Sequence, residues 1–465
     1  MKVTFLTHQR PEILKEALVS FIQYLKNSGK PADITVLDDS IDPAAVAANR
    51  ELAAGLTGTF SGSLRCFGWA ERELLADRLC PGSPEPALDF ALSLPGAGVR
   101  GHSGANRNTG LLLYTGQKIL SLDDDTLFCF RRLRDGRAFH ENSGDIPLLL
   151  PLGSRKRLER LTVPTDWDPD VLQEILGSPP HTGDYTGPVK LAMSGIYGGR
   201  WYTNPHAYCA VPPRTANKIW QGKKEYVAAR QDPWALMVQP EVSFSGAPFL
   251  VSTCFGYDSS EPVPPFFPGI RSSDSLWAWM LRAMYPESPI CHLPLAIEHE
   301  RSIKQPFEED DFSRIVPGAS EIIVKLLDFL RQGVPGSPEA PGMLSALGSG
   351  LSRFAAEPVQ RRREILSELY LASLGRRIGA FHERLEAGGG RPRFFGEDLK
   401  RHIDLLHNEA LDSRPWLPKE FRLKDDIAGE EAFRRYLDSC GELLCAWPEI
   451  WQRAEALCKS GDQIL

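Results

Sequence analysis

Strand-like and helix-like segments alternate along the first 130 residues, and this alternation limits the chain to few folds. Residues 3–7 and 34–37 are short apolar runs of the kind that form buried strands. Between them, Pro11 suits the first turn of a helix, and apolar residues then recur at helical spacing as far as Leu25. A second helical pattern covers residues 43–54. Strands separated by helices pair in parallel through right-handed crossovers, so the sequence predicts an α/β fold.

The next unit of this kind ends in three consecutive carboxylates. Residues 106–115 have the pattern of a helix, and 117–122 form a strand pattern that leads into Asp123, Asp124 and Asp125. Residues i and i+2 of a strand point the same way, so Asp123 and Asp125 can face one site beyond the end of the strand. Like charges this close repel, and a hard divalent cation such as Mg²⁺ or Mn²⁺ relieves that repulsion. The alternative is a solvated turn whose Asp residues cap a helix.

Length and composition bound the class of protein. A single core seldom grows past roughly 250–300 residues, so 465 residues predict two or three structural units. Apolar residues make up 42% and charged residues 24%, which excludes a fully disordered chain. The net charge of −7 disfavours nucleic acid and anionic membrane surfaces as partners.

The sequence also predicts a cytoplasmic protein without a membrane span. Apolar runs of about 18 residues, which a spanning helix needs, do not occur. The N-terminus lacks the long apolar core and the small-residue cleavage site of a signal peptide. The nine cysteines are odd in number and scattered, which fits reduced thiols better than a disulfide framework.

Four segments resemble the family 2 type of glycosyltransferase, and they occur in that family's order. Residues 3–11 resemble its opening strand and T-x-x-R-P turn, and 34–42 resemble its second strand with an acidic ending, here V-L-D-D-S-I-D. Residues 104–111 resemble its A-R-N-x-G helix start, and 119–126 its DxD strand. The resemblance implies a GT-A fold, with a mixed sheet flanked by helices. It also implies a nucleotide-diphosphate sugar as donor.

On the donor side, the resemblance implies roles residue by residue. Asp38 and Asp39 match residues that contact the nucleobase and ribose, while Thr7 and Arg10 lie at the nucleotide-side turn. Arg107 matches an Arg that can neutralise diphosphate charge, although a solvated helix Arg is the alternative. The implied nucleotide-sugar-binding residues are Thr7, Arg10, Asp38, Asp39, Arg107, Asp123 and Asp124.

The resemblance also implies a metal site for Mn²⁺ or Mg²⁺. Asp125 matches the last DxD carboxylate, the direct metal ligand, and Asp123 matches the first, near the ribose and the metal. His299 follows the strand pattern at 293–297, where some GT-A enzymes place a further metal ligand. An ordinary surface histidine is the alternative for that position.

For the acceptor side, the resemblance implies a general base. Inverting sugar transfer requires a group that accepts the proton of the acceptor hydroxyl. Asp274 matches that base, at the start of a helix pattern over 274–283, but Ser273 stands where the family has Glu. The alternative is that Asp274 only caps the helix.

The chain thus divides into three predicted parts. Residues 1–130 form the nucleotide-sugar-binding half of a GT-A domain, 131–310 its acceptor-binding half, and 311–465 a helical C-terminal region. The composition of 333–350, rich in Gly, Pro, Ser and Ala, predicts a linker or exposed loop. The apolar stripes of the following helices need a partner surface, which is each other, the catalytic part or a second copy in a homo-oligomer.

The sequence therefore predicts a metal-dependent glycosyltransferase of the hexosyltransferase type, working with inversion. Its acceptor would be a glycan, a protein or peptide, or a small molecule, and not a nucleic acid. One alternative is an inactive GT-A-like protein that binds nucleotide sugars or serves as a scaffold. A nucleotidyltransferase is disfavoured, because no Gly-rich, Lys-containing loop follows the first strand.

Overall fold

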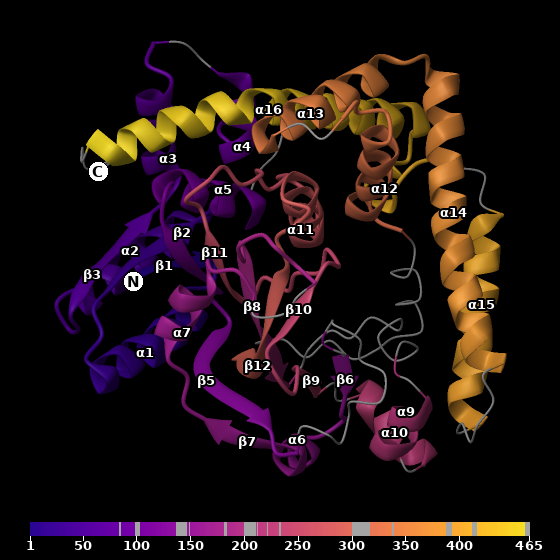
Figure 1. Ribbon diagram of the computed structural model, residues 1–465, viewed down its shortest axis with the longest axis horizontal. Helices are drawn as coiled ribbons and strands as arrows, with labels where there is room; N and C mark the ends of the chain where they lie inside the picture. Colours follow the sequence, from indigo (N-terminus) through magenta and orange to yellow (C-terminus); the bar gives the residue numbers. More distant parts are fainter. Residues whose placement is uncertain are drawn as a thin grey trace.

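The chain has a mixed α/β fold in which helices lie on both faces of one large sheet (Figure 1). The computed structural model describes residues 1–82, 85–97, 103–135, 147, 149–180, 184–199, 211, 213–220, 222–231, 234–299, 317–336, 339–386, 393–411 and 416–460. No helix in these ranges is long and apolar enough to cross a membrane.

The N-terminal part consists of parallel strands linked by helices, as the alternation predicts. Its strands pair in the order β3-β2-β1-β4, all in parallel. Each strand and helix expected here is present, with bounds that differ by a few residues. The elements are β1 (Lys2–Thr7), α1 (Pro11–Ser28), β2 (Ala32–Asp38), α2 (Pro43–Leu56), β3 (Gly62–Phe67), α3 (Trp69–Leu79), α4 (Pro86–Leu92), α5 (Ser103–Leu113) and β4 (Lys118–Asp123).

Helices α1 and α5 cover opposite faces of these strands because successive side chains of a strand point to opposite sides. On one face, Phe5 of β1 meets Phe21 of α1, with ring centroids 5.7 Å apart. On the other, Gly110 of α5 lies over Thr4 and Leu37, and a Cβ there would be 3.2 Å from Leu37 Cδ1. This close approach places the N-terminal end of α5 beside the carboxyl ends of β1 and β2.

The middle of the chain continues the sheet with mostly antiparallel strands. β11 pairs antiparallel with both β4 and β8, and β12 lies between β8 and β5. The strand and helix expected near 293–297 and 274–283 are both present. The elements are β5 (Thr126–Leu133), β6 (Leu149–Pro151), α6 (Arg155–Leu161), β7 (Thr162–Thr165), α7 (Pro169–Ile175), β8 (Leu191–Gly198), α9 (Pro213–Ile219), α10 (Lys223–Gln231), β9 (Ala235–Met237), β10 (Ser243–Ser245), β11 (Cys254–Asp258), α11 (Ser273–Met284) and β12 (Ile290–His299).

The C-terminal region is helical, as its periodicity predicts. In Figure 1, α16 runs beside α13 across α3, α4 and α5, while α14 and α15 descend together towards α9 and α10. The helices therefore pack on each other and on the rest of the chain; a homo-oligomer stays a prediction. The predicted boundary at residue 310 lies outside the described residues. The elements are α12 (Ala319–Arg331), α13 (Ala340–Ala356), α14 (Val359–Glu386), α15 (Arg393–Ala410), η3 (Lys419–Phe421) and α16 (Asp426–Ser460).

The predicted linker over 333–350 is wrong for most of its length. Helix α13 begins at Ala340, and its small residues form the surface on which α16 packs. A Cβ on Gly348 would lie 2.6 Å from the carbonyl oxygen of Gly441, and one on Gly441 would lie 2.4 Å from Ser352 Oγ. The glycines thus allow two helix backbones to approach closely. Composition alone does not distinguish such a close helix crossing from a flexible segment.

Replacing Gly348 by Ala tests this helix crossing. Gly348→Ala should lower the free energy of unfolding by about 2 kcal/mol, because the added methyl group overpacks the contact with α16. Gly375 of α14 is the matched control, since a Cβ there meets no atom within 4 Å. Gly375→Ala should raise the free energy by about 0.5–1 kcal/mol through helix propensity. Urea unfolding measures both, and equal effects would contradict the close crossing.

Candidate functional site

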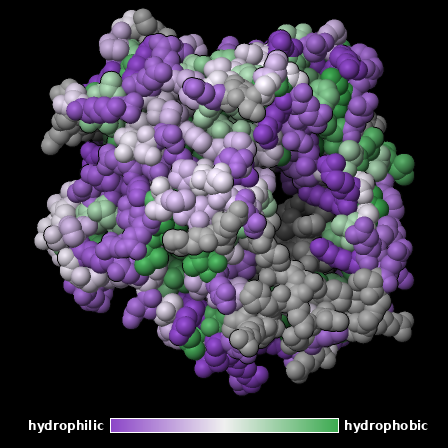
Figure 2. Space-filling view, viewed as in Figure 1, coloured by the Kyte–Doolittle hydropathy of each residue, from purple (hydrophilic) through white to green (hydrophobic). Residues whose placement is uncertain are grey.

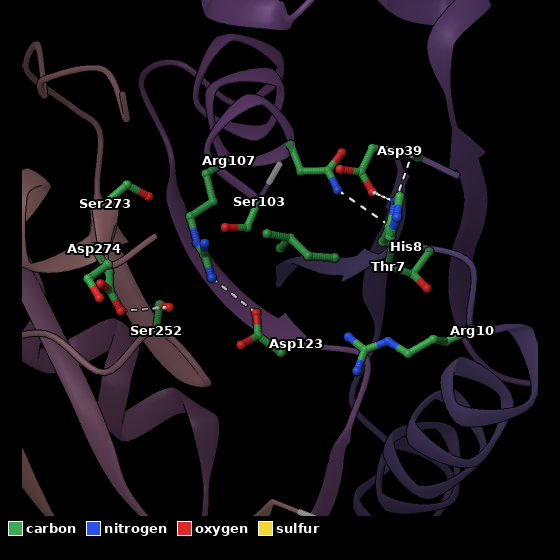
Figure 3. A pocket seen from close by; sticks show the side chains of 13 residues that line it. Thr7, His8, Arg10, Asp39, Ser103, Arg107, Asp123, Ser252, Ser273 and Asp274 are labelled. Carbon is green, nitrogen blue, oxygen red and sulfur yellow. Dashed lines mark hydrogen bonds and ion pairs between the residues drawn. The ribbon is translucent and has the colours of Figure 1, made fainter. Parts of the chain in front are cut away.

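A cavity of about 350 Å³ opens where β1, β2 and β4 leave the sheet at their carboxyl ends. Figure 3 shows Asp39 on one side of it and Asp274 on the other, with Arg107 and Asp123 between them. The lining comes from segments far apart in sequence. The lining residues are Leu6, Thr7, His8, Arg10, Asp39, Ser103, Asn106, Arg107, Asp123, Ser252, Ser272, Ser273 and Asp274.

The structure brings most of the predicted site residues to this place. Those that line the cavity are Thr7, Arg10, Asp39, Arg107, Asp123 and Asp274. The remaining predicted residues adjoin the lining residues. Asp38 precedes Asp39, Asp124 and Asp125 both bind Arg10, and His299 binds Asp125.

Asp124 faces the first strand and is fully buried. Its carboxylate accepts hydrogen bonds from Thr7 Oγ1 at 2.7 Å and from Arg10 Nη2 at 2.5 Å. Burial raises the pKa of Asp124 to about 7, and the guanidinium of Arg10 opposes that rise. Asp124 therefore holds the end of β4 against the turn after β1. It would influence a bound ligand only through its contacts with Thr7 and Arg10.

Asp123 and Arg107 form an ion pair that faces the cavity. Arg107 Nη2 donates to Asp123 Oδ1 at 3.0 Å, and the side chain of Arg107 is only 5% exposed. Arg107 also lies over the ring of Phe266, with its Cζ 5.5 Å from the centroid. The alternative of a solvated helix Arg is therefore wrong. Burial raises the pKa of Asp123, while Arg107 acts to lower it.

Asp125 and His299 meet although 174 residues separate them, because β5 and β12 pair with His299 opposite Thr126. His299 Nε2 lies 3.1 Å from Asp125 Oδ1, and Arg10 Nη1 lies 3.1 Å from Asp125 Oδ2. His299 is 5% exposed, so the alternative of an ordinary surface histidine is wrong.

The donor chemistry of this pair suits a divalent cation. A carboxylate and an imidazole are both ligands of Mn²⁺, and the carboxylate also suits Mg²⁺. Asp123, the third predicted ligand, is directed to Arg107. Among the described residues, groups of three or more His, Cys, Asp or Glu side chains that could hold a metal ion are absent. Metal binding thus stays a prediction that rests on two protein ligands, and the other positions would go to the substrate and water.

Asp38 and Asp39 have different surroundings although both are buried. The Asp38 carboxylate accepts from the Ser40 amide and from Asn49 Nδ2, both at 2.9 Å, and so braces the loop after β2. Asp39 accepts from His8 Nδ1 at 3.0 Å inside the cavity. Asp38 borders a second cavity of about 630 Å³, whose walls include Ile41, Trp69 and Pro95.

Asp274 lies in the first turn of α11 and points into the cavity (Figure 3). One carboxylate oxygen accepts from the Ser252 hydroxyl at 3.2 Å, and the other accepts from the Ser275 amide at 2.9 Å. The capping position itself belongs to Ser272, which has a left-handed backbone with φ of 59°. Asp274 thus serves the helix start with one oxygen and faces the cavity with the other.

Several residues that line or support the cavity were not identified from the sequence. His8 and Asn106 lie inside segments that match the family pattern. The sequence therefore places them near the site but assigns them no role. Ser252 precedes β11 in a segment without a motif, and only the fold brings it to Asp274. Arg72 is completely buried and contacts Asn106, the Asp38 carbonyl and the Trp69 ring. No sequence pattern distinguishes Arg72 from an exposed helix Arg.

Comparison of the chain with known protein families and with curated proteins gives no match. The family resemblance therefore rests on the four sequence segments alone.

The contact of His8 with Asp39 predicts a shifted titration. Hydrogen bonding and charge from Asp39 raise the pKa of His8 above 6.5, against burial and Arg10. The stabilising effect of the pair is complete below pH 6.5 and is lost as pH rises through the raised pKa. NMR titration should show this upward shift in the wild type. Asp39→Asn should return the pKa of His8 towards 6.5, whereas Asp42→Asn, at the exposed start of α2, should not. An unchanged titration in Asp39→Asn would contradict the pairing.

Proposed function

We propose that the chain is a metal-dependent glycosyltransferase with the GT-A fold. It moves a hexosyl group from a nucleotide-diphosphate sugar to an acceptor, with inversion. The observation that carries this proposal is the shared cavity of Asp123 and Asp274. On one side of this cavity lies Asp123, at the end of β4 and paired with Arg107. On the other side lies the carboxylate of Asp274, which is suited to accept a proton.

The donor side supplies cations and planar surfaces. Arg10 and Arg107 line the cavity, where their guanidinium groups can bind the phosphate oxygens in bidentate fashion. Asp39 faces the ribose, and the nucleobase enters the second cavity beside Trp69, whose ring is partly exposed. Asp125 and His299, with Asp123 beside them, would hold Mn²⁺ or Mg²⁺. Such a cation stabilises the negative charge that develops on the departing diphosphate.

The acceptor side supplies the base. Asp274 accepts the proton of the acceptor hydroxyl, while that oxygen bonds to the anomeric carbon and the bond to the diphosphate breaks. Attack from the face opposite the leaving group inverts the configuration. The Ser252 hydroxyl, 3.2 Å from Asp274 Oδ2, holds the carboxylate in a fixed orientation. The acceptor is a glycan, a protein or peptide, or a small molecule that presents a hydroxyl group.

Substitution of Asp125 tests the donor side. Wild-type protein should be stabilised by one of the UDP-, GDP- or dTDP-sugars in the presence of Mn²⁺, and should transfer or hydrolyse that sugar. Asp125→Ala should lower the rate at least about a hundredfold and abolish metal-dependent binding, because the cation loses a charged ligand. The fold should survive. Thermal shift and product analysis measure both effects.

The exposed Asp166 provides the control, and Asp166→Ala should behave as wild type. Full activity of Asp125→Ala with the metal chelated would contradict the metal-dependent mechanism. Release of pyrophosphate from a nucleoside triphosphate would instead indicate a nucleotidyltransferase.

One observation favours a second candidate function. Ser273, where the resemblance leads us to expect Glu, is buried at the start of α11. A protein that binds nucleotide sugars without turnover would tolerate this change. Metal-dependent binding without product or hydrolysis across an acceptor panel would support that alternative.

A further inference from the structure

The segment 259–272, between β11 and α11, brings Asp274 to the cavity. It contains several prolines, which have no amide hydrogen to donate, and it does not pair as a strand. Its path ends in two left-handed residues, Gly269 with φ of 83° and Ser272 with φ of 59°. A non-glycine residue in this region is strained, so surrounding contacts must hold the turn in place.

Part of this support comes from neighbouring elements of the α/β structure. Asn108 of α5 donates to the Phe266 carbonyl at 2.8 Å and accepts from its amide at 2.7 Å. Trp277 of α11 donates to the Pro264 carbonyl at 2.6 Å, and its ring stacks on Phe266 with centroids 4.8 Å apart. Tyr285 donates to the Pro262 carbonyl at 2.7 Å. These contacts fix the first half of the segment.

The C-terminal helix α16 adds two further hydrogen bonds. Trp447 Nε1 donates to the Val263 carbonyl at 2.7 Å, and the Tyr436 hydroxyl donates to the Pro268 carbonyl at 2.8 Å. Both side chains are buried, and both bonds are neutral. The Tyr436 ring packs against Phe90 of α4, with centroids 5.9 Å apart, so the hydroxyl has a defined direction. Pro268 directly precedes the turn at Gly269 that leads to Asp274.

We propose that Tyr436 and Trp447 are positioning residues for Asp274, and that the C-terminal region thereby completes the acceptor side of the site. This proposal rests on the proposed function. A buried carbonyl group that loses its hydrogen-bond donor raises the free energy of the folded state. The segment 259–272 lowers this free energy by shifting. A shift of Pro268 moves the strained turn, and with it Asp274. The donor side keeps its ion pairs from Arg10 and Arg107, because Phe266, on which Arg107 lies, is held separately by Asn108.

Tyr436→Phe and Trp447→Phe test the proposal, because each removes a donor and keeps an aromatic ring. Each should lower kcat roughly tenfold and leave KM for the nucleotide sugar within about twofold, since misplacement of a catalytic group slows the chemical step. Hydrogen exchange of residues 259–275 should become faster in both. Metal-dependent binding of the nucleotide sugar should persist.

Tyr370→Phe is the matched control for a general loss of stability. Tyr370 is a buried tyrosine of α14 whose hydroxyl contacts Glu409 of α15 and Arg422, which follows η3, and α14 lies apart from α11 in Figure 1. This variant should lose stability with kcat and exchange of 259–275 unchanged. Wild-type kcat and exchange in Tyr436→Phe and Trp447→Phe would overturn the proposal. If the wild type transfers no sugar, the proposed function fails. Unchanged hydrogen exchange of residues 259–275 in Tyr436→Phe and Trp447→Phe would then separately overturn the support of this segment by α16.

Discussion

The neutralisation of three consecutive carboxylates at the end of β4 is the interaction on which the site depends. Each carboxylate meets a cationic or hydrogen-bonding group from a different element: Arg107 from α5, Arg10 from the start of α1, and His299 from the end of β12. A buried carboxylate without such a partner costs several kcal/mol. Sheet pairing and helix packing bring these elements together, and the ion pairs hold their ends around the cavity.

The sequence was sufficient to predict the alternating strands and helices of residues 1–130, because their signals are local. Residues 3–7, 34–37 and 117–122 are apolar runs that end in polar residues, and parallel pairing brings those ends together. Contacts that join distant elements give no such local signal, and only the family resemblance suggested His299. His299 reaches Asp125 only through the register of β12 with β5, and Ser252 reaches Asp274 only through the fold.

The small residues of α13 show a different limit. Gly348 and its neighbours suggested a linker, since the same composition suits a flexible segment and a close helix crossing. What decides between them is the partner helix, whose Gly441 lies 93 residues further along the chain. Periodicity did predict the apolar stripe of α16, but it did not identify the surface that covers it. The bonds of Trp447 and Tyr436 to the loop before α11 have sequence separations of 184 and 168 residues.

The two sides of the cavity differ in how they are held, and this difference suits the proposed reaction. Neutral hydrogen bonds hold the acceptor side. These bonds do not change when a charged ligand binds or leaves. Ion pairs hold the donor side, where a diphosphate must compete with carboxylates for the same guanidinium groups. Five carboxylates, those of Asp39, Asp123, Asp124, Asp125 and Asp274, lie here with two guanidinium groups, Arg10 and Arg107, and two imidazoles, His8 and His299. A dianionic diphosphate adds further negative charge to this acidic site, and a divalent cation that enters with it would offset that charge. The charges already present therefore support the metal dependence of the proposed function.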